Sequence, residues 1–404
     1  MTSSDTKMSS TPSSAHLRRI ESIDLLRGIV MIIMALDHVR DYFHSDAYLY
    51  NPLDLSQTNI LLFFTRWITH FCAPVFVFLA GTSAFLVGTR KGKSELTAFL
   101  LKRGFWLVLL EFTIINFSWF FNIQFPLLTL TVIWALGISM IVLAGAIHLP
   151  FKVILATGIL IVAAHNMLDS FHVTDGNTFA AFWKVLHEYS GFQLSRFFIF
   201  VGYPVIPWIG CMLLGYCFGT LYSSSVNPAF RKKALLYLGF PGIILFIVIR
   251  AINIYGDPLP WTEQPNTVYT LLSFLNVSKY PPSLLYILIT LSPAMVFLAA
   301  SEQYNGKFFQ NIISLGRVPM FYYIIHLYFI HLLALAAAVL TGYAASDMVF
   351  NTWITDSPNL KGYGFSLGIV YLIWISIVLA LFPLCLWYDT YKKNHRNQWW
   401  LSYI

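Results

Sequence analysis

Charged residues are scarce in this sequence: Asp, Glu, Lys and Arg together make up 11% of its 404 residues, while 57% are hydrophobic. Soluble domains carry about a quarter charged residues, so a chain of this composition has too little polar surface to fold in water. Its mean hydropathy is +0.67, and its apolar runs are about 20 residues long, the length that crosses a bilayer as a helix. The composition therefore predicts an all-α polytopic membrane protein.

Cysteine is rare too, and the motifs of common cofactors do not occur. The four cysteines fall inside apolar runs without a Cys-x-x-Cys spacing; they are Cys72, Cys211, Cys217 and Cys385. This distribution argues against a zinc site or a disulfide framework. The dinucleotide motif Gly-x-Gly-x-x-Gly, the P-loop and the zinc motif His-Glu-x-x-His are all missing. We expect no bound metal. Basic residues form no stripe interleaved with aromatics, so the net charge of +7 indicates anionic lipid as the partner and not nucleic acid.

The apolar runs predict about ten membrane-spanning helices in a single transmembrane domain over residues 21–390. They lie near 24–43, 60–88, 96–117, 127–147, 152–168, 198–221, 233–253, 283–300, 319–341 and 366–388. The Ser- and Thr-rich start predicts a disordered cytoplasmic tail over residues 1–20, and residues 391–404 are expected to form a second tail. No small-residue cleavage site follows the first run, which favours a retained helix over a signal peptide.

Basic and acidic loops alternate along the chain. The basic ones hold Lys7, Arg18 and Arg19, then Arg90, Lys91 and Lys93, then Arg231, Lys232 and Lys233, then Lys307 and Arg317, and finally Lys392, Lys393 and Arg396. The intervening loops carry Asp and Glu with few basic residues. Basic loops stay in the cytoplasm, so this alternation predicts that both termini are cytoplasmic and that the number of spans is even.

The first span ends in a cluster of titratable side chains, in the stretch ALDHVRDYFH at 35–44. A charge at mid-bilayer costs roughly 2.5–3.5 kcal/mol on insertion scales, which makes such residues functional candidates. The spacing i, i+3, i+4, i+7 predicts one helical stripe of Asp37, Arg40, Asp41 and His44. His38 lies on a neighbouring face together with Arg27, about 16 Å away along the helix axis.

Other polar residues lie within the later spans. Arg66 and His70 share a face of the second span at i, i+4, Glu111 lies in the third span and His326 in the ninth. An interhelical pair of Arg66 with Glu111 is one structural interpretation that stays open.

Purely structural interpretations also exist for the first span. Asp37, Arg40 and Asp41 could form an ion-pair ladder, and His44 is typical of a histidine at the membrane interface. His38 is harder to explain in this way, because it lies below the surface beside an aspartate that could fix its tautomer and raise its basicity.

Two stretches resemble the heparan-α-glucosaminide N-acetyltransferase catalytic-domain family: SIDLLRGIVMIIMALDHVRDYF and FCAPVFVFLAGTSAFL. The Asp-x-x-Arg-Gly signature of that family corresponds to Asp24–Gly28, and its Pro-x-Phe-Val-Phe-x-x-Gly stretch to Pro74–Gly81. VIWALGISM at 132–140 is similar to its Gln-Arg-Leu-Gly element. The resemblance covers about residues 18–140 and is closest to an uncharacterised bacterial branch. The Arg27–His38 spacing is also similar to that of the membrane acyltransferases that O-acetylate surface sugars.

The resemblance implies acetyl transfer across a bacterial inner membrane. Acetyl-CoA would be the co-substrate on the cytoplasmic side, and an amine of an amino sugar or glycan on the outer face would be the acceptor. The heparan enzymes have an asparagine at the position of His38 and a catalytic histidine further along, to which His44 is the nearest counterpart. We expect His38, supported by Asp37, to be the general base, with His44 as the alternative.

The implied reaction also assigns roles to the remaining polar residues. A thioester carbonyl that develops negative charge needs donors, for which Arg66, His70 and His326 are candidates. The phosphates of CoA need cations near the cytoplasmic mouth, where the candidates are Arg27, Arg103 and Arg317.

Two other functions stay open. One is an O-acetyltransferase of surface polysaccharide with the same geometry. The other is a proton-coupled transporter without enzymatic activity, in which a relay would run through Asp37, His38, His70 and Glu111. The oligomeric state is open as well, including a homo-oligomer.

Overall fold

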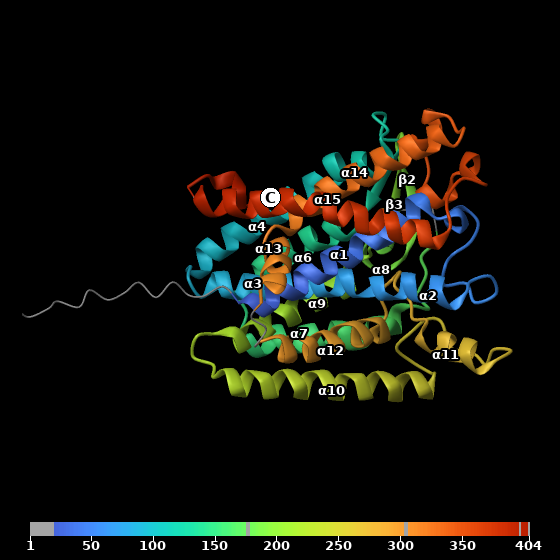
Figure 1. Cartoon of the computed structure of the whole chain (residues 1–404). Coiled ribbons are helices and arrows are strands. Elements are labelled where there is room, and N and C mark those ends of the chain that lie inside the picture. The colour runs from blue at the N-terminus through green and yellow to red at the C-terminus, as the bar shows by residue number, and fades with distance from the viewer. Residues whose placement is uncertain (1–19, 175–177, 303–305, 396, 403–404) are drawn as a thin grey trace, which may run out of the picture.

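The computed structural model describes residues 20–174, 178–302, 306–395 and 397–402. It is mostly helical, with long helices that run side by side (Figure 1). The first half contains α1 (Glu21–Phe43), α2 (Ile60–Trp67), α3 (Cys72–Gly88), α4 (Lys93–Leu110), α5 (Asn116–Phe120), α6 (Val132–Ala146), α7 (Phe151–Ala164) and α8 (Thr178–His187). The second half contains α9 (Val205–Phe218), α10 (Pro228–Ile252), α11 (Thr267–Leu275), α12 (Leu284–Ser301), α13 (Lys307–Gly316), α14 (Pro319–Leu340) and α15 (Leu367–Asn394).

Seven helical segments in the described part of the chain are long and apolar enough to cross a membrane. They are Ile60–Gly88, Phe151–Leu168, Val205–Tyr222, Pro228–Ile252, Leu284–Ser301, Pro319–Leu340 and Leu367–Asn394. Helices also occupy the other three predicted places, but α6 has only 15 residues, short of the about 20 that the hydrocarbon core requires. An integral membrane protein is confirmed in this coarse sense, and the count of ten spans stays a prediction.

The all-α class is wrong in one respect, because three short strands form a sheet in the order β1-β3-β2. Strand β1 (Leu127–Leu130) pairs parallel with β3 (Phe197–Val201), which pairs antiparallel with β2 (Ser190–Leu194). Two predicted spans, 127–147 and 198–221, therefore begin as strands. Short apolar runs look alike in hydropathy whether they become strand or helix, so the sequence pattern alone misassigned them.

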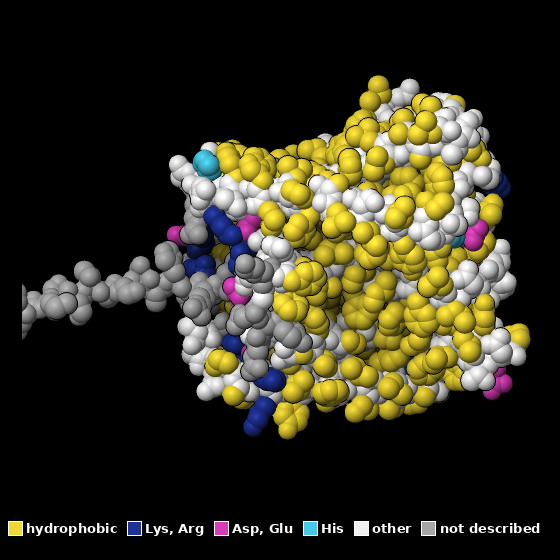
Figure 2. Space-filling view, viewed as in Figure 1, with side chains coloured by type: hydrophobic (Ala, Val, Ile, Leu, Met, Phe, Trp, Pro, Cys, Tyr) yellow, Lys and Arg dark blue, Asp and Glu magenta, His cyan; other side chains and the backbone are white. Residues whose placement is uncertain are grey.

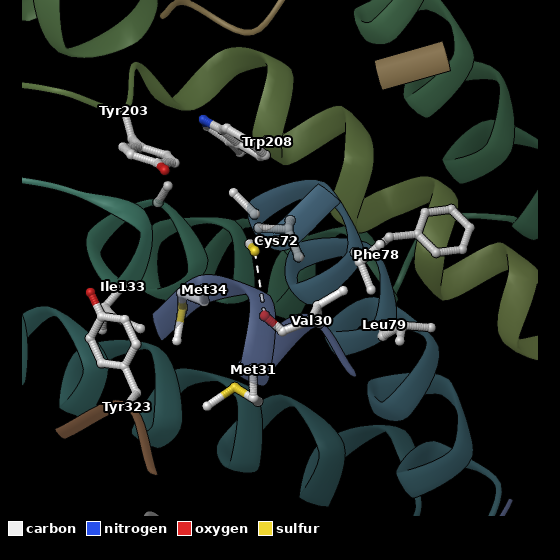
Figure 3. Close-up of a cluster of buried hydrophobic side chains, with 14 of the residues drawn as sticks. Val30, Met31, Met34, Cys72, Phe78, Leu79, Ile133, Tyr203, Trp208 and Tyr323 are labelled. Atoms are coloured by element: carbon white, nitrogen blue, oxygen red, sulfur yellow. Dashed lines mark hydrogen bonds between the residues drawn. The ribbon is translucent and has the colours of Figure 1, made fainter. Parts of the chain in front are cut away.

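Helix α1 lies at the centre of the molecule and packs against α3, α12, α13, α14 and α15. Side chains of α1 and α3 interdigitate in the core shown in Figure 3: Val30, Met31 and Met34 from α1, and Cys72, Phe78 and Leu79 from α3. The Cys72 thiol donates to the Val30 carbonyl oxygen at 3.4 Å. Asp37, His38 and Arg40 of the same helix are also buried, so these side chains are surrounded by protein and kept away from lipid.

The two family-like stretches contain glycines at which backbones meet. A Cβ added to Gly28 would lie 2.1 Å from the carbonyl oxygen of Ile312 in α13, and one added to Gly81 would lie 2.2 Å from that of Met212 in α9. Neither position has room for a side chain. These signature glycines therefore set the contacts of α1 with α13 and of α3 with α9.

The start of α1 and the end of α15 lie at the same end of the molecule (Figure 1). Arg317 joins them, because it contacts Asp24 at 3.7 Å and Asp389 at 3.6 Å. Figure 2 shows Lys and Arg side chains gathered at this end and a largely hydrophobic flank beside it. A hydrophobic flank with a cationic end matches a chain embedded in a bilayer.

Candidate functional site

A cavity of about 1110 Å³ lies beside the C-terminal end of α1. Side chains of α1, of the α2–α3 segment and of strand β3 form its inner part. The loops around 46–54 and 353–361 form its outer part, and the 276–280 loop reaches the inner part, where Lys279 lies beside Asp37. Six predicted site residues line it: Asp37, His38, Arg40, Asp41, His44 and Arg66. The other six do not: Arg27, His70, Arg103, Glu111, Arg317 and His326.

Asp37 is the centre of a buried ion cluster. Its Oδ2 lies 2.5 Å from Nη1 of Arg66, and its Oδ1 lies 2.9 Å from Nη2 of Arg40. The same Nη2 lies 2.5 Å from Oδ1 of Asp41. Lys279, in the loop before α12, is 3.6 Å from Asp37. Sequence reasoning missed Lys279, although a lone lysine in an otherwise acidic loop was a signal that could have found it.

His38 pairs with His326, which is 288 residues further along the chain. Nδ1 of His326 lies 2.8 Å from the Tyr322 carbonyl oxygen. Since a carbonyl oxygen only accepts, this nitrogen carries the proton, and Nε2 of a neutral His326 is then an acceptor. Nδ1 of His38 lies 2.8 Å from that Nε2 and therefore donates. The remaining nitrogen of His38, Nε2, keeps its lone pair.

Nε2 of His38 has no hydrogen-bond partner among the described residues, and its imidazole lines the cavity. Trp119 packs edge-on against the ring, with the centroids 4.8 Å apart. We expected Asp37 to fix the His38 tautomer, but Nδ1 of His38 donates its hydrogen bond to His326 and not to Asp37. Asp37 instead binds cations, and it influences His38 through its charge.

His44 does not continue the helical stripe. It caps α1 with an extended backbone, φ −80° and ψ 131°, and its Nδ1 accepts the backbone N–H of Asp46 at 3.2 Å. It still lines the cavity. The i+7 spacing overestimated the helix by one residue, because the last turn ends where the chain pairs with Phe365.

Glu111 and His70 lie outside the cavity. Glu111 accepts from the backbone N–H and hydroxyl of Thr131 at 3.2 and 2.6 Å, and from the N–H of Trp134 at 3.0 Å. It therefore caps the start of α6, and the interhelical pair with Arg66 is not formed. The His70 ring is buried edge-on to Tyr286, and neither of its nitrogens has a hydrogen-bond partner among the described residues.

The predicted relay is not continuous in this structure. Within the described part of the chain, no hydrogen bond joins any two of its four members; they are Asp37, His38, His70 and Glu111.

The three arginines predicted to bind CoA lie away from the cavity. Arg27 donates to the Leu79 carbonyl oxygen at 2.7 Å and to the Ser83 hydroxyl, and contacts Asp24 at 3.4 Å. Asp24 thus brings Arg27 and Arg317 together. The Arg103 guanidinium, on α4, lies 5.9 Å from the centroid of Phe99.

One wall of the cavity is a continuous row of aromatic rings in mutual contact. The row runs through Trp119, Trp353, Phe200, Tyr189, Tyr280 and Tyr203, with neighbouring centroids 5.1–5.8 Å apart. The rings come from five separate segments of the chain. Such a wall offers flat apolar faces beside charged side chains of the same cavity, an arrangement suited to a ligand with both apolar C–H faces and polar groups.

Fold and cavity together define the class: an integral membrane protein of helices with a polar, histidine-bearing pocket at one end. The family model "Heparan-alpha-glucosaminide N-acetyltransferase, catalytic" matches residues 19–255, more than half of the chain. The chain belongs to this family, which confirms the resemblance seen in the sequence and indicates a membrane acetyltransferase. No curated protein matches the chain significantly. No cluster of three or more metal-ligating side chains occurs among the described residues.

Proposed function

We propose that this protein transfers the acetyl group of acetyl-CoA to an amino group of a sugar or glycan on the outer face of a bacterial inner membrane. The observation that carries the proposal is the His38–His326 pair, which presents an unprotonated imidazole nitrogen to the cavity. The family match supplies the reaction class.

His38 acts as the general base in this proposal. As the acceptor nitrogen attacks the thioester carbonyl carbon, Nε2 of His38 takes the proton that the nitrogen loses. The carbonyl oxygen becomes negative, the C–S bond then breaks, and the departing CoA thiolate takes that proton from His38 and leaves as the thiol. Of the three candidate donors for that oxygen, Arg66 is the one that lines the cavity, so we assign it this role. His326 holds His38, and His70 lies behind the wall.

The aromatic wall favours a sugar as the acceptor. A pyranose has C–H faces that pack on aromatic rings and hydroxyl groups that hydrogen-bond to polar side chains. The cavity offers both kinds of surface, and its volume of about 1110 Å³ exceeds what a monosaccharide needs.

Coenzyme binding is assigned to the opposite end of α1. Arg27 and Arg317 lie together at Asp24, about 16 Å along the helix from His38. A phosphate would compete with Asp24 for the two guanidinium groups. Arg103 is the third cation that we assign to this end.

The test is acetyl transfer by purified protein in proteoliposomes, with labelled acetyl-CoA and two acceptors, glucosamine and N-acetylglucosamine. Acetylation of glucosamine alone supports an amine acceptor, since the two sugars differ only in whether this nitrogen is a free amine or already acetylated. Equal acetylation of both acceptors would identify the O-acetyltransferase instead. No acetyl transfer and no thermal protection by acetyl-CoA would leave the transporter as the better explanation.

A further inference from the structure

The inner end of the cavity holds more positive than negative charge. Three cations, Arg40, Arg66 and Lys279, surround two carboxylates, Asp37 and Asp41. Arg40 is 4% exposed and Lys279 is 7% exposed. An unbalanced charge removed from water is costly unless a counter-charge or hydrogen bonds compensate it.

Two of these cations carry N–H donors for which the described part of the protein supplies no acceptor. Nε and Nη1 of Arg40 are buried without a partner among the described residues. Nζ of Lys279 makes no hydrogen bond in the described part of the chain; its contacts are Asp37 at 3.6 Å and the Tyr280 ring at 5.2 Å. Buried donors in folded proteins are nearly always paired, and both side chains line the cavity.

The Tyr280 phenol reports the same excess of positive charge. Burial raises its pKa, but the charges of Lys279 and Arg66 outweigh burial, and the pKa lies below its usual value. Tyr280 belongs to the aromatic wall and stacks on Tyr189 with centroids 5.1 Å apart. The positive field thus reaches the surface on which a sugar ring would lie.

Two acidic residues at the rim, Asp46 and Asp54, are different, because neighbouring side chains donate hydrogen bonds to them; Asp356 lies at the exposed rim. Asp46 accepts from the Tyr50 hydroxyl at 2.6 Å. Asp54 accepts from the Ser56 hydroxyl at 2.7 Å and from the Gln57 amide at 3.0 Å. At the inner end of the cavity, two buried cations therefore keep hydrogen-bonding capacity that no described residue fills.

We propose that the ligand of this cavity is an anionic sugar, whose carboxylate or phosphate oxygens bind Lys279 and Arg40 while its ring lies on the aromatic wall. The proposal rests on the proposed function only for the role of this sugar as the acetyl acceptor. The anion site itself follows from the unpaired buried cations. A uronic acid and a sugar phosphate share the required chemistry, since each carries oxygens that accept from an ammonium and a guanidinium.

The first experiment measures binding and needs no turnover. Thermal unfolding of the detergent-solubilised protein is followed with glucuronate, glucose 6-phosphate, glucose or inorganic phosphate. We expect glucuronate or glucose 6-phosphate to raise Tm at concentrations at which glucose does not. Whichever of the two protects at the lower concentration identifies the carboxylate or the phosphate. Equal protection by inorganic phosphate would mean an adventitious ion only, and equal protection by glucose would remove the anion from the proposal.

Variants of two lysines in the same cavity sharpen the test. Lys279→Gln removes the buried charge, and we expect it to weaken protection by the anionic sugar roughly 10- to 100-fold in concentration. Lys279→Arg keeps the charge and should keep the protection. The matched control is Lys361→Gln, at the exposed rim of the cavity, which should bind as the unchanged protein does. Full protection in Lys279→Gln would overturn the proposal.

A second experiment separates this site from the chemistry. With glucosamine and glucosamine 6-phosphate as acceptors, Lys279→Gln should raise KM for the phosphorylated sugar alone. An equal fall in kcat for both acceptors would show that Lys279 serves the reacting carbonyl and not an anionic substituent. Protection without any acetyl transfer would preserve the anion site and reject the proposed function.

Discussion

At the residue scale, the state of the His38 imidazole depends on a chain of two hydrogen bonds. The Tyr322 carbonyl fixes the proton on Nδ1 of His326, and the free nitrogen of His326 fixes the proton on Nδ1 of His38. The nitrogen that faces the cavity is thereby kept as an acceptor. A base held in one tautomer by a neighbour is a common means of preparing histidine for proton abstraction.

We therefore expect His38→Ala to abolish transfer while acetyl-CoA still binds, because the base acts on the acceptor and not on the coenzyme. The loss in kcat should be about 10² to 10⁴, measured in proteoliposomes, with acetyl-CoA binding followed by thermal shift. His44→Ala is the comparison. If His44→Ala is inactive and His38→Ala retains most of its activity, the base is His44 and the assignment made here is wrong.

The His326 variants test the tautomer argument. His326→Leu removes the acceptor from Nδ1 of His38, so that its proton is free to occupy the nitrogen that faces the cavity, and kcat should fall by about 10-fold or more with little change in KM. His326→Gln supplies a carbonyl oxygen as acceptor and should retain much more activity. Equal losses in the two variants, with unchanged thermal unfolding, would show that the hydrogen bond to His38 is not what His326 contributes.

At the element scale, the Asp-x-x-Arg-Gly signature joins the start of α1 to α13 and to Arg317. Asp24 contacts Arg27 and Arg317, while Gly28 and Gly316 let the backbones of α1 and α13 touch. A Cβ on Gly316 would lie 1.8 Å from the Asp24 carbonyl oxygen. The signature thus has a packing role in addition to the coenzyme role that we assign to Arg27.

Gly28→Ala should destabilise the protein, since the added methyl meets backbone that cannot rotate away. Overpacking of this kind costs about 1–3 kcal/mol, which is measurable as a lower Tm in detergent. Gly145→Ala, in α6, is the control, because nothing lies within 4 Å of its added Cβ. That substitution should be neutral or stabilising by up to about 1 kcal/mol. Equal effects of the two would contradict a tight contact between α1 and α13.

At the scale of the whole molecule, the cavity and the cluster around Asp24 lie at opposite ends of α1. Residues Asp24 and Arg27 are in its first two turns, and Asp37–Asp41 are near its end at Phe43. If both termini are cytoplasmic, as the basic loops predict, the coenzyme cations face the cytoplasm and the cavity faces outside. The direction of acetyl transfer follows from this orientation.

Cysteine labelling tests that orientation directly. The four natural cysteines are buried, so background reaction with a membrane-impermeant maleimide should be low. Ser56→Cys precedes the Ile60–Gly88 segment and should be labelled from outside; Lys93→Cys follows it and should be labelled only after the membrane is opened. Labelling of Lys93→Cys in intact cells would reverse both the topology and the direction of the reaction.

The sequence by itself determined the class of protein, the place of its polar helix and its family. Composition sets the solvent that a chain can fold in, and helical spacing within one segment is fixed by 3.6 residues per turn. Asp37, His38, Arg40, Asp41 and Arg66 line one cavity, and the functional roles assigned to them stay predictions. The family signatures were readable because they are local.

Only the tertiary structure decided what these residues face. His326, Lys279 and Trp353 come from beyond residue 255, where the family match ends, and no periodicity relates them to α1. Periodicity did not predict the contacts of Glu111 either, which caps α6 across a turn and a strand. Partner choice between distant segments depends on which faces of separate helices and loops meet, and that is set by packing of the whole chain.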